Sequence, residues 1–151
     1  RLEGDLTPSS EWQFHADIYR ERPEVRAVVH AHSPYATGLA CTRQGIPGFH
    51  YEVAMAGGIN IRCAEYATFG TRALARHALR ALDGRMACLL ANHGQIALGD
   101  SVPAALAMAV KVETLARQYC LARQCGEPVL LEEDEMRVNV AKFRSYGKQG
   151  D

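Results

Sequence analysis

The sequence predicts an α/β domain in which helices cover a central mixed or antiparallel sheet. Short Val- or Leu-rich runs, typical of strands, are interspersed with longer segments of helical spacing. The last two apolar runs, residues 86–91 and 95–98, are separated only by Asn92-His93-Gly94, a hairpin signal that argues against a purely parallel sheet. The chain has 151 residues, 48% of them hydrophobic, which fits one domain with a sizeable core.

Helix caps, prolines and a Val-rich run divide the first half of the chain into helices and strands. Ser9 and Ser10 offer N-caps for the first helix, and Pro34 suits the first turn of the second. A Gly57-Gly58 break precedes the next strand. The expected elements are a helix from residue 9 or 10 to about 20, a strand at 25–30, a helix from 34 to about 43 and a strand at 59–63.

The second half contains the expected hairpin and three helices. Gly70-Thr71 begins a helix with apolar residues at helical spacing, and Asp83-Gly84 ends it. Ser101 caps a long helix that has Pro103 in its first turn. The expected elements are a helix at 71–82, strands at 86–91 and 95–98, a helix from 101 to about 125 and a more polar helix at 132–146.

Charge and cysteine usage exclude several classes of partner and compartment. Lys plus Arg equals Asp plus Glu, and the basic residues are scattered, so we expect no nucleic-acid or membrane partner. The five cysteines are odd in number and include no CxxC pair, so neither a disulfide framework nor a zinc ribbon is predicted. No run of apolar residues is long enough to span a bilayer, and no signal peptide is visible. Together with cysteines that are expected to be reduced, this predicts a cytoplasmic protein.

The segment His30-Ala31-His32, at the end of an apolar run, is the strongest functional signal. In a strand, residues two apart point to the same side, about 6.6 Å apart along the backbone. Two imidazoles would then converge on one point, and histidine is a common ligand of zinc-like metals. Glu11, at the start of a helix, and His93, at the hairpin tip, complete a candidate four-ligand shell. A carboxylate that can leave the metal could also serve as a base.

Each of these residues also has an ordinary structural interpretation. Glu11 could be an acid favoured by the helix dipole, and Ser9 and Ser10 could be caps alone. His93 could be a turn residue with unusual backbone angles, and Tyr51 could belong to the core. A contact between Glu11 and His15, four residues further along the helix, competes with metal binding.

Five segments in order then support a resemblance: PSSEW, VVHAH, FHY with MAGG, YATFGT and LLANHG. Together they resemble the class II aldolase/adducin family, and most closely its L-fuculose-phosphate aldolases. The resemblance extends through residues 143–147 and implies one class II aldolase/adducin-type domain over residues 1–151, with a three-layer arrangement. It also implies a zinc-dependent aldehyde-lyase, which cleaves a ketose 1-phosphate such as L-fuculose 1-phosphate to dihydroxyacetone phosphate and a small aldehyde.

The resemblance also assigns roles to individual residues. It implies that His30, His32 and His93 hold the zinc ion. Glu11 is the fourth ligand at rest and moves off to take a proton from the bound ketose phosphate. Tyr51, contributed by a neighbouring subunit, handles the proton at the aldehyde oxygen. Imidazole and carboxylate suit other divalent metals as well, so zinc is one of several candidates.

Further implications concern the substrate phosphate and the assembly. Ser9 and Ser10 correspond to serines that bind the phosphate, and Tyr146 falls in a tail that helps to close the site. Members of the family form cyclic homotetramers with active sites at subunit interfaces. They begin with an N-terminal segment that carries a Gly-Asn-x-Ser-type phosphate loop. We expect this chain, which begins just before PSSEW, to lack that segment and half of the phosphate site, which puts its own activity in question.

Other functions remain open on the same scaffold. Pentulose-5-phosphate 4-epimerases of the superfamily use the same three histidines but typically have Asp after the serines, so Glu11 favours an aldolase. Sugar-acid phosphate decarboxylases and thiosugar dehydratases are further alternatives. A non-catalytic adducin-like assembly module would have lost metal ligands, whereas all four positions are retained here. A small structural zinc protein is disfavoured because no thiolates occur at zinc spacing.

Overall fold

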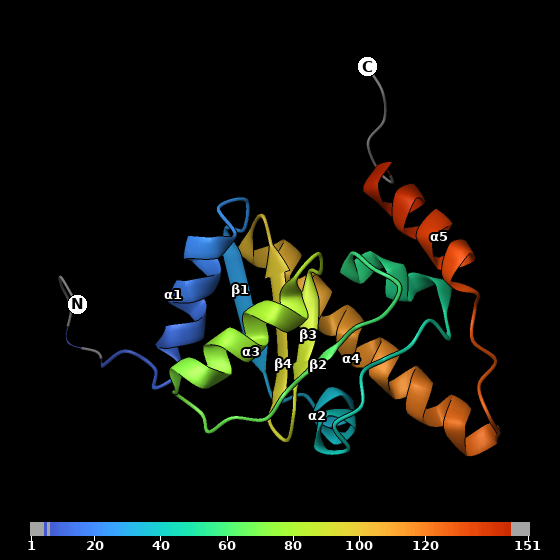
Figure 1. Cartoon of the computed structure of the whole chain (residues 1–151), viewed down its shortest axis with the longest axis horizontal. Helices are drawn as coiled ribbons and strands as arrows, with labels where there is room; N and C mark the ends of the chain where they lie inside the picture. Colours follow the sequence, from blue (N-terminus) through green and yellow to red (C-terminus); the bar gives the residue numbers. More distant parts are fainter. Residues whose placement is uncertain (1–4, 6, 146–151) are drawn as a thin grey trace.

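The computed structural model describes residue 5 and residues 7–145, and Figure 1 shows a sheet between helices, as predicted. Within these residues, no helix is both long and apolar enough to cross a membrane. The elements in order are α1 (Trp12–Glu21), β1 (Ala27–Ala31), α2 (Pro34–Cys41), the 3-10 helix η1 (Tyr51–Ala56), β2 (Cys63–Ala64), α3 (Arg72–Leu82), β3 (Ala87–Leu90), β4 (Gly94–Gly99), α4 (Val102–Cys125) and α5 (Glu133–Ser145).

The sheet is mixed, with the strand order β1-β4-β3-β2. Strand β4 pairs antiparallel with β1 on one side and with β3 on the other, which confirms the predicted hairpin. Strand β2 runs parallel to β3. The pairing places His30 of β1 opposite Ile96 of β4, so the strand that carries His30 lies directly beside the hairpin.

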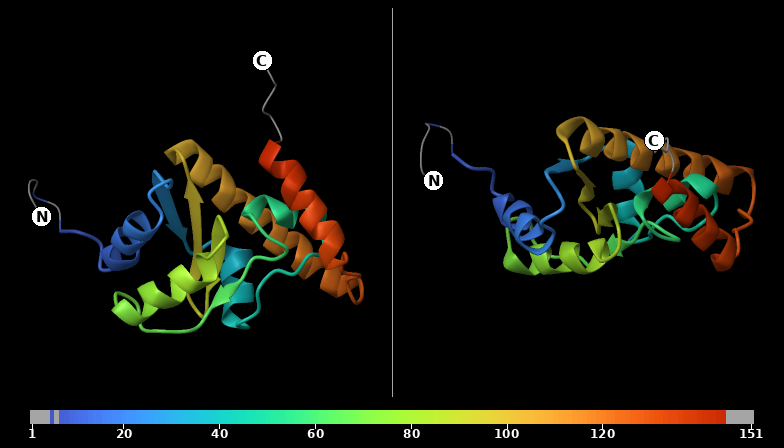
Figure 2. Two further views of the ribbon diagram at one scale, coloured as in Figure 1. Left: turned by 45° about the horizontal axis from the view of Figure 1, so that its top comes forward. Right: turned by 90° about the horizontal axis from the view of Figure 1, so that it is seen from above.

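Helices cover both faces of the sheet, which makes three layers (Figure 2). Successive residues of β3 point to opposite faces: Ala87 and Leu89 pack into the core beneath α2 and α4, whereas Cys88 and Leu90 pack into the core with α1 and α3. All four residues of β3 are buried. The strands at the centre of the sheet therefore read as continuous apolar runs instead of alternating ones.

Two details of the expected elements are wrong. Ser9 and Ser10 do not cap α1 directly: Glu11 occupies the N-cap position, and the Ser9 hydroxyl accepts a hydrogen bond from the Glu11 N–H at 3.2 Å. The strand expected at 59–63 is reduced to Cys63–Ala64. Before it, Ile61 forms an isolated bridge with Ile46, with N–H to carbonyl distances of 2.8 and 2.9 Å, so this part of the chain pairs outside the sheet.

The segment between α2 and β2 contains η1, for which the sequence predicted no helix. This 3-10 helix packs against α5, away from the sheet (Figure 1). The side chain of His50 caps η1 by accepting a hydrogen bond from the Glu52 N–H at 3.3 Å. The Glu52 carboxylate pairs with Lys111 of α4 at 3.0 Å. Tertiary contacts with α4 and α5 therefore hold this segment in place.

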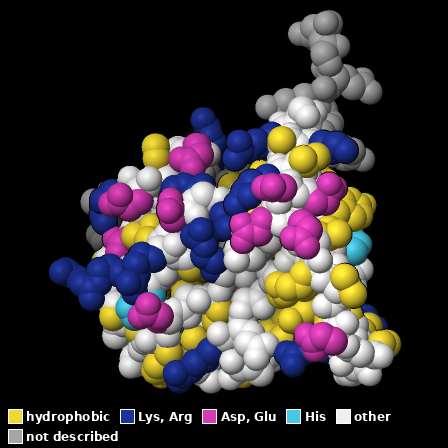
Figure 3. Space-filling view, turned by 45° about the vertical axis from the view of Figure 1, so that its right-hand side comes forward, with side chains coloured by type: hydrophobic (Ala, Val, Ile, Leu, Met, Phe, Trp, Pro, Cys, Tyr) yellow, Lys and Arg dark blue, Asp and Glu magenta, His cyan; other side chains and the backbone are white. Residues whose placement is uncertain are grey.

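Charged side chains of both signs are interspersed on the surface, as the dark blue and magenta atoms of Figure 3 show. Many form short-range pairs, such as Arg20 with Asp17 and Arg137 with Glu133. This distribution agrees with the zero net charge and shows no uniform basic face in that view.

The five cysteines differ in reactivity because of their burial. All are free; Cys41 and Cys125 are exposed, and burial raises the pKa of Cys63 to about 11. Because pH 8 is below this pKa, the Cys63 thiol stays protonated, and a protonated thiol is a poor nucleophile. Titration of the folded protein with a thiol reagent at pH 8 should therefore modify Cys41 and Cys125 first, with all five reacting after denaturation. Equally fast modification of Cys63 would contradict the burial described here.

Candidate active site

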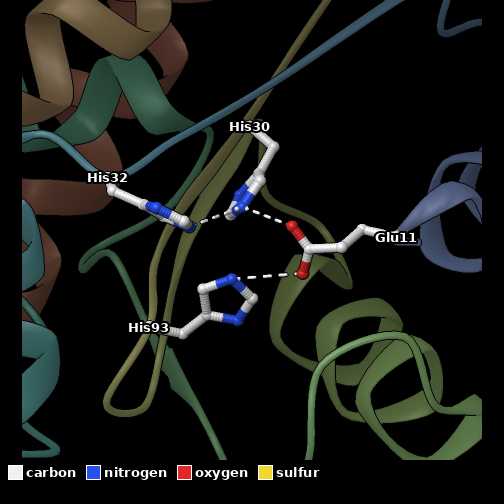
Figure 4. Close-up of side chains that lie close together, drawn as sticks. All are labelled: Glu11, His30, His32 and His93. Atoms are coloured by element: carbon white, nitrogen blue, oxygen red, sulfur yellow. Dashed lines mark hydrogen bonds and ion pairs between the residues drawn. The ribbon is translucent and has the colours of Figure 1, made fainter. Parts of the chain in front are cut away.

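The His30–His32 pair converges as the strand geometry predicts. His30 lies within β1, and His32 follows the last residue of that strand. Their Nε2 atoms are 3.0 Å apart, and the ring planes are nearly perpendicular. Both lone-pair positions therefore face one point at the end of the sheet (Figure 4).

The β3–β4 turn brings His93 to the same point. Asn92, just before it, has a left-handed φ of 54°, which asparagine tolerates better than most residues. Gly94, just after it, lies so close to β1 that a Cβ there would be 2.5 Å from the Ala31 carbonyl oxygen and 2.8 Å from the His32 ring. A glycine at this position therefore allows the hairpin tip to approach the His30–His32 strand.

Glu11 reaches the three histidines from the start of α1. The helix is held by Phe14 and Ile18, which are buried in the core. The carboxylate lies between two imidazoles, with Oε2 3.0 Å from His30 Nε2 and Oε1 3.1 Å from His93 Nε2 (Figure 4). The structure thus brings together all four residues of the predicted shell.

The donor set fits a divalent metal ion. One ligand atom from each of the four side chains lies within 4.8 Å of every other, and this is the one such group of three or more found in the described part of the chain. Ligands of a tetrahedral zinc site at ordinary bond lengths are spaced by about 3.4 Å. Glu11 Oε1 is also buried, and it has no hydrogen-bond partner among the described residues, although His93 Nε2 lies 3.1 Å away. A cation would satisfy this oxygen and the converging nitrogen lone pairs.

A hydrogen bond at the ring nitrogen that faces away from the cluster fixes the orientation of His30. Its Nδ1 is 2.9 Å from the Gln95 carbonyl oxygen, so Nδ1 carries the proton and donates it there. This tautomer leaves the Nε2 lone pair directed at the cluster. Phe14 packs edge-on against the ring at 5.3 Å between centroids. Such a hydrogen bond to the outer nitrogen is typical of metal-binding histidines.

The surroundings of His93 favour its neutral imidazole form. Burial lowers the pKa of His93, as do the neighbouring His30 and His32, and the Glu11 carboxylate opposes this shift. Neutral imidazole is the form that binds a metal.

The contact between Glu11 and His15 that competes with metal binding does not form. No hydrogen bond or ion pair joins them among the described residues. His15 instead stacks on Phe14 at 4.6 Å. Burial, together with His30, lowers the pKa of His15, against the opposing effect of Glu11.

A cavity of about 450 Å³ opens in front of the cluster. The cavity is lined by Glu11, His32 and His93 of the cluster and by Ser10, whereas Ser9 does not line it. The other lining residues, which sequence reasoning did not single out as site residues, are Tyr66, Ala67, Phe69 and Asn92. The YATFGT segment was the available signal, because it contains the first three of these.

Tyr51 lies apart from this cavity in its own chain. It is the first residue of η1, is 49% exposed, and its ring stacks on Phe143 of α5 at 6.1 Å. It is not among the residues that line the 450 Å³ cavity. Its predicted contribution to a neighbouring subunit stays a prediction, and Tyr146 lies outside the described residues.

Gln95 ties the site to the helices behind it. It is the one buried polar residue among those described, 1% exposed. Its Nε2 donates to Ser33 Oγ at 2.7 Å and to the Ala109 carbonyl at 3.2 Å. Ser33 directly follows His32, so this amide connects the ligand strand to α4.

Gln95→Leu should lower the free energy of unfolding by about 2 kcal/mol, because two hydrogen bonds of about 1 kcal/mol each are lost. Urea denaturation of the metal-free protein measures this. Ser33→Ala removes only one of the two bonds and should have about half the effect. Wild-type stability of both variants would show that the Gln95 amide adds nothing.

Comparison with known proteins places the chain in a family. The family model described as Class II Aldolase and Adducin N-terminal domain matches residues 1–120. The chain belongs to the class II aldolase/adducin family. This confirms the family that the five sequence segments indicated.

The relatives of this class II aldolase-family chain are sugar-phosphate aldolases. It is 57% identical over 144 residues to the 5-methylthioribulose-1-phosphate/5-deoxyribulose-1-phosphate aldolase of Rhodospirillum rubrum. This alignment covers 95% of this chain and 65% of that protein. The chain is also 45% identical over 146 residues to the L-fuculose phosphate aldolase of Escherichia coli K12. That alignment covers 96% of this chain and 67% of that protein. The chain thus spans about two thirds of the length of these relatives.

A solved structure confirms the fold. An L-fuculose 1-phosphate aldolase superposes with a TM-score of 0.91 at 46% identity, over 95% of this chain and 67% of that one. The α/β fold with a mixed sheet flanked by helices is therefore that of class II aldolases, as predicted.

Proposed function

We propose that this chain provides the metal centre of an aldolase that cleaves a ketose 1-phosphate to dihydroxyacetone phosphate and a small aldehyde. The observation that carries the proposal is the convergence of Glu11 and three histidines beside a cavity of about 450 Å³, which Glu11, His32 and His93 line. A purely structural zinc site has four closed ligands and no cavity, whereas a catalytic one leaves room for substrate. The names of both relatives, which are sugar-phosphate aldolases, support the same reaction.

His30, His32 and His93 would hold the metal, with zinc as the first candidate. Three imidazole nitrogens and one carboxylate oxygen are a donor set that zinc accepts. A bound divalent ion supplies a Lewis acid that polarises a substrate oxygen. Glu11 is the one anionic ligand, and it comes from a helix start instead of the sheet.

Glu11 would transfer the proton at the carbon beside the substrate carbonyl. During cleavage the electrons of the broken C–C bond pass to that carbon, and Glu11, after taking a proton from solvent, delivers that proton to it; in the reverse direction Glu11 removes the same proton. The carboxylate lines the cavity, and His30 and His93 are the partners of its oxygens among the described residues. A carboxylate held only by these partners can exchange them for a substrate proton.

Tyr51 would act in the cavity of a neighbouring subunit. Its hydroxyl would take up the proton of the substrate hydroxyl that becomes the aldehyde while it releases its own proton to solvent. Its half-exposed ring and its position outside its own cavity leave it available to another copy. An exposed apolar stripe on α4, made of Val102, Leu106 and Val110, supports an assembly, which we propose to be a homotetramer.

The substrate phosphate would bind where α1 begins. Ser10 lines the cavity beside Glu11, and the free N–H groups of a helix N-terminus attract anions. Ser9 would contribute less directly, because its hydroxyl accepts from the Glu11 N–H.

The aldehyde end of the substrate would be apolar. Tyr66 and Phe69 are 52% and 65% exposed and face the cavity together with Ala67. Such a wall suits a methyl or methylthio terminus better than a hydroxymethyl one. The methylthio and deoxy sugars in the name of the Rhodospirillum rubrum relative agree with this preference.

A cytoplasmic location is part of this proposal. All five cysteines are free, which is the usual state of thiols in the reducing cytosol. Phosphorylated sugars are charged and do not cross a bilayer unaided, so an enzyme for them works where they are made.

A retro-aldol assay of the complete protein on ketose 1-phosphates that differ only at the terminal carbon tests the proposal. Methyl and methylthiomethyl substrates should be cleaved with about 10–200-fold higher kcat/KM than the hydroxymethyl analogue. Release of dihydroxyacetone phosphate is the readout. Epimerisation without cleavage would instead support a 4-epimerase, and no reaction of a metal-loaded protein would support an assembly module.

A further inference from the structure

A second hollow lies between η1 and α5, away from the metal cluster. These two elements pack side by side, as Figures 1 and 2 show. Two adjoining cavities of about 350 and 430 Å³ open there, and they share Gly57, Arg85, Val140 and Arg144 as lining residues. We call these two cavities the arginine groove.

Every charged side chain that lines the arginine groove is an arginine. Arg22 lines the first cavity, Arg137 lines the second, and Arg85 and Arg144 line both. No Asp or Glu is among the described lining residues of either cavity. The groove is therefore a concentrated positive site on a chain of zero net charge.

Nearby carboxylates neutralise only part of this charge. Arg22 pairs with Glu24, and Arg137 pairs with Glu133 and Asp134. Arg144 has no ion pair within residues 7–145. Among the described residues, Arg85 donates only to uncharged acceptors: the Asn60 carbonyl at 2.9 Å, Asn60 Oδ1 at 3.0 Å and the Gly84 carbonyl at 3.2 Å.

Arg85 is held in place as a rigid cation. Its guanidinium lies against Gly58, where a Cβ would overlap it. Burial lowers the pKa of Arg85, and so does the nearby charge of Arg62, which outweighs the opposing effect of Asp83. These causes mean that its surroundings do not compensate the positive charge, and a bound anion would.

We propose that the arginine groove binds a small oxyanion, a phosphate ester or a carboxylate, with Arg85 and Arg144 as its charged donors. The planar guanidinium matches the oxygens of such anions, and two arginines from different elements can grip one from both sides. A bound anion would also fasten α5 onto η1, where Phe143 lines the groove and stacks on Tyr51. The proposal does not depend on the proposed aldolase reaction.

Titration of the complete, isotope-labelled protein with inorganic phosphate, followed by amide chemical shifts, tests this site. At constant ionic strength, the Gly57 and Gly58 amides should shift and saturate with one Kd, separately from Ser10 at the active site. Arg144→Gln should raise that Kd about tenfold, because a charge-assisted hydrogen bond is lost. The matched control Lys142→Gln removes the same charge from the same helix outside the groove, and should change Kd less than twofold.

Gly58→Ala is the second variant, because its methyl group would displace the Arg85 guanidinium and should weaken binding similarly. A parallel titration with malonate distinguishes the sources: tighter phosphate binding identifies a phosphate ester, and tighter malonate binding a carboxylate, both within the proposed class. Unshifted Gly57 and Gly58 amides would overturn the proposal. So would equal effects of Arg144→Gln and Lys142→Gln.

Discussion

Glu11→Gln is expected to lower kcat for ketose 1-phosphate cleavage by about 10²–10⁴-fold while the protein keeps much of its metal. The amide has the size of the carboxylate, and its oxygen can still face the cluster, but at pH 7 it can neither take up nor deliver the transferred proton. Three imidazoles remain to hold the ion. Steady-state assay of dihydroxyacetone phosphate release, together with metal analysis of the same sample, measures both effects.

The matched control is Glu21→Gln at the other end of α1, where the side chain is exposed and far from the cluster. It should retain wild-type kcat. If the Glu11→Gln variant kept more than a tenth of wild-type turnover, another group would have to be the base, and Glu11 would be a ligand alone.

His32→Ala is expected to remove the metal. The wild-type protein should carry about one divalent ion per subunit, as the four converging ligands indicate. Loss of a residue that hydrogen-bonds to a metal ligand typically weakens metal binding by about 10–100-fold. Loss of a ligand itself should therefore weaken it more. Metal content after dialysis and competition with a chelating dye measure this without reference to activity.

His77→Ala controls for the loss of a histidine. His77 lies on α3, where its Nδ1 is 3.0 Å from the Glu65 carbonyl, outside the cluster. It should bind metal as the wild type does. Unchanged metal content in His32→Ala would refute the convergence of the pair, and a folded wild-type protein that binds no divalent ion would refute the site.

Local rules predicted those site residues that lie near one another in sequence. His30 and His32 converge because side chains two apart in a strand share a face, and this depends on nothing beyond the strand itself. The hairpin at Asn92-His93-Gly94 was predictable from its turn residues. Glu11 was recognised only through the PSSEW motif, because an acid at a helix start has an equally good structural explanation.

Where the sequence misled, a contact that it did not reveal outweighed a local preference. Ser9 is a good helix cap by propensity, yet its hydroxyl accepts from Glu11, which becomes the N-cap itself. Ile61 was expected within a strand, but it pairs with Ile46 across a loop. Gln95 was read as a strand residue, and its role behind His30 and Ser33 required the packing of β4 between β1 and α4.

The sequence by itself determined the order of the elements, a sheet that is not purely parallel, the family and the four candidate ligands. These depend on periodicity, turn chemistry and short motifs, which act over a few residues. Only the tertiary structure decided that Glu11 lies between His30 and His93, that Tyr66 and Phe69 face the cluster, and that arginines from separate elements share one groove. Those arrangements arise when helices pack on the two faces of a sheet, and no local pattern records which distant side chains then meet.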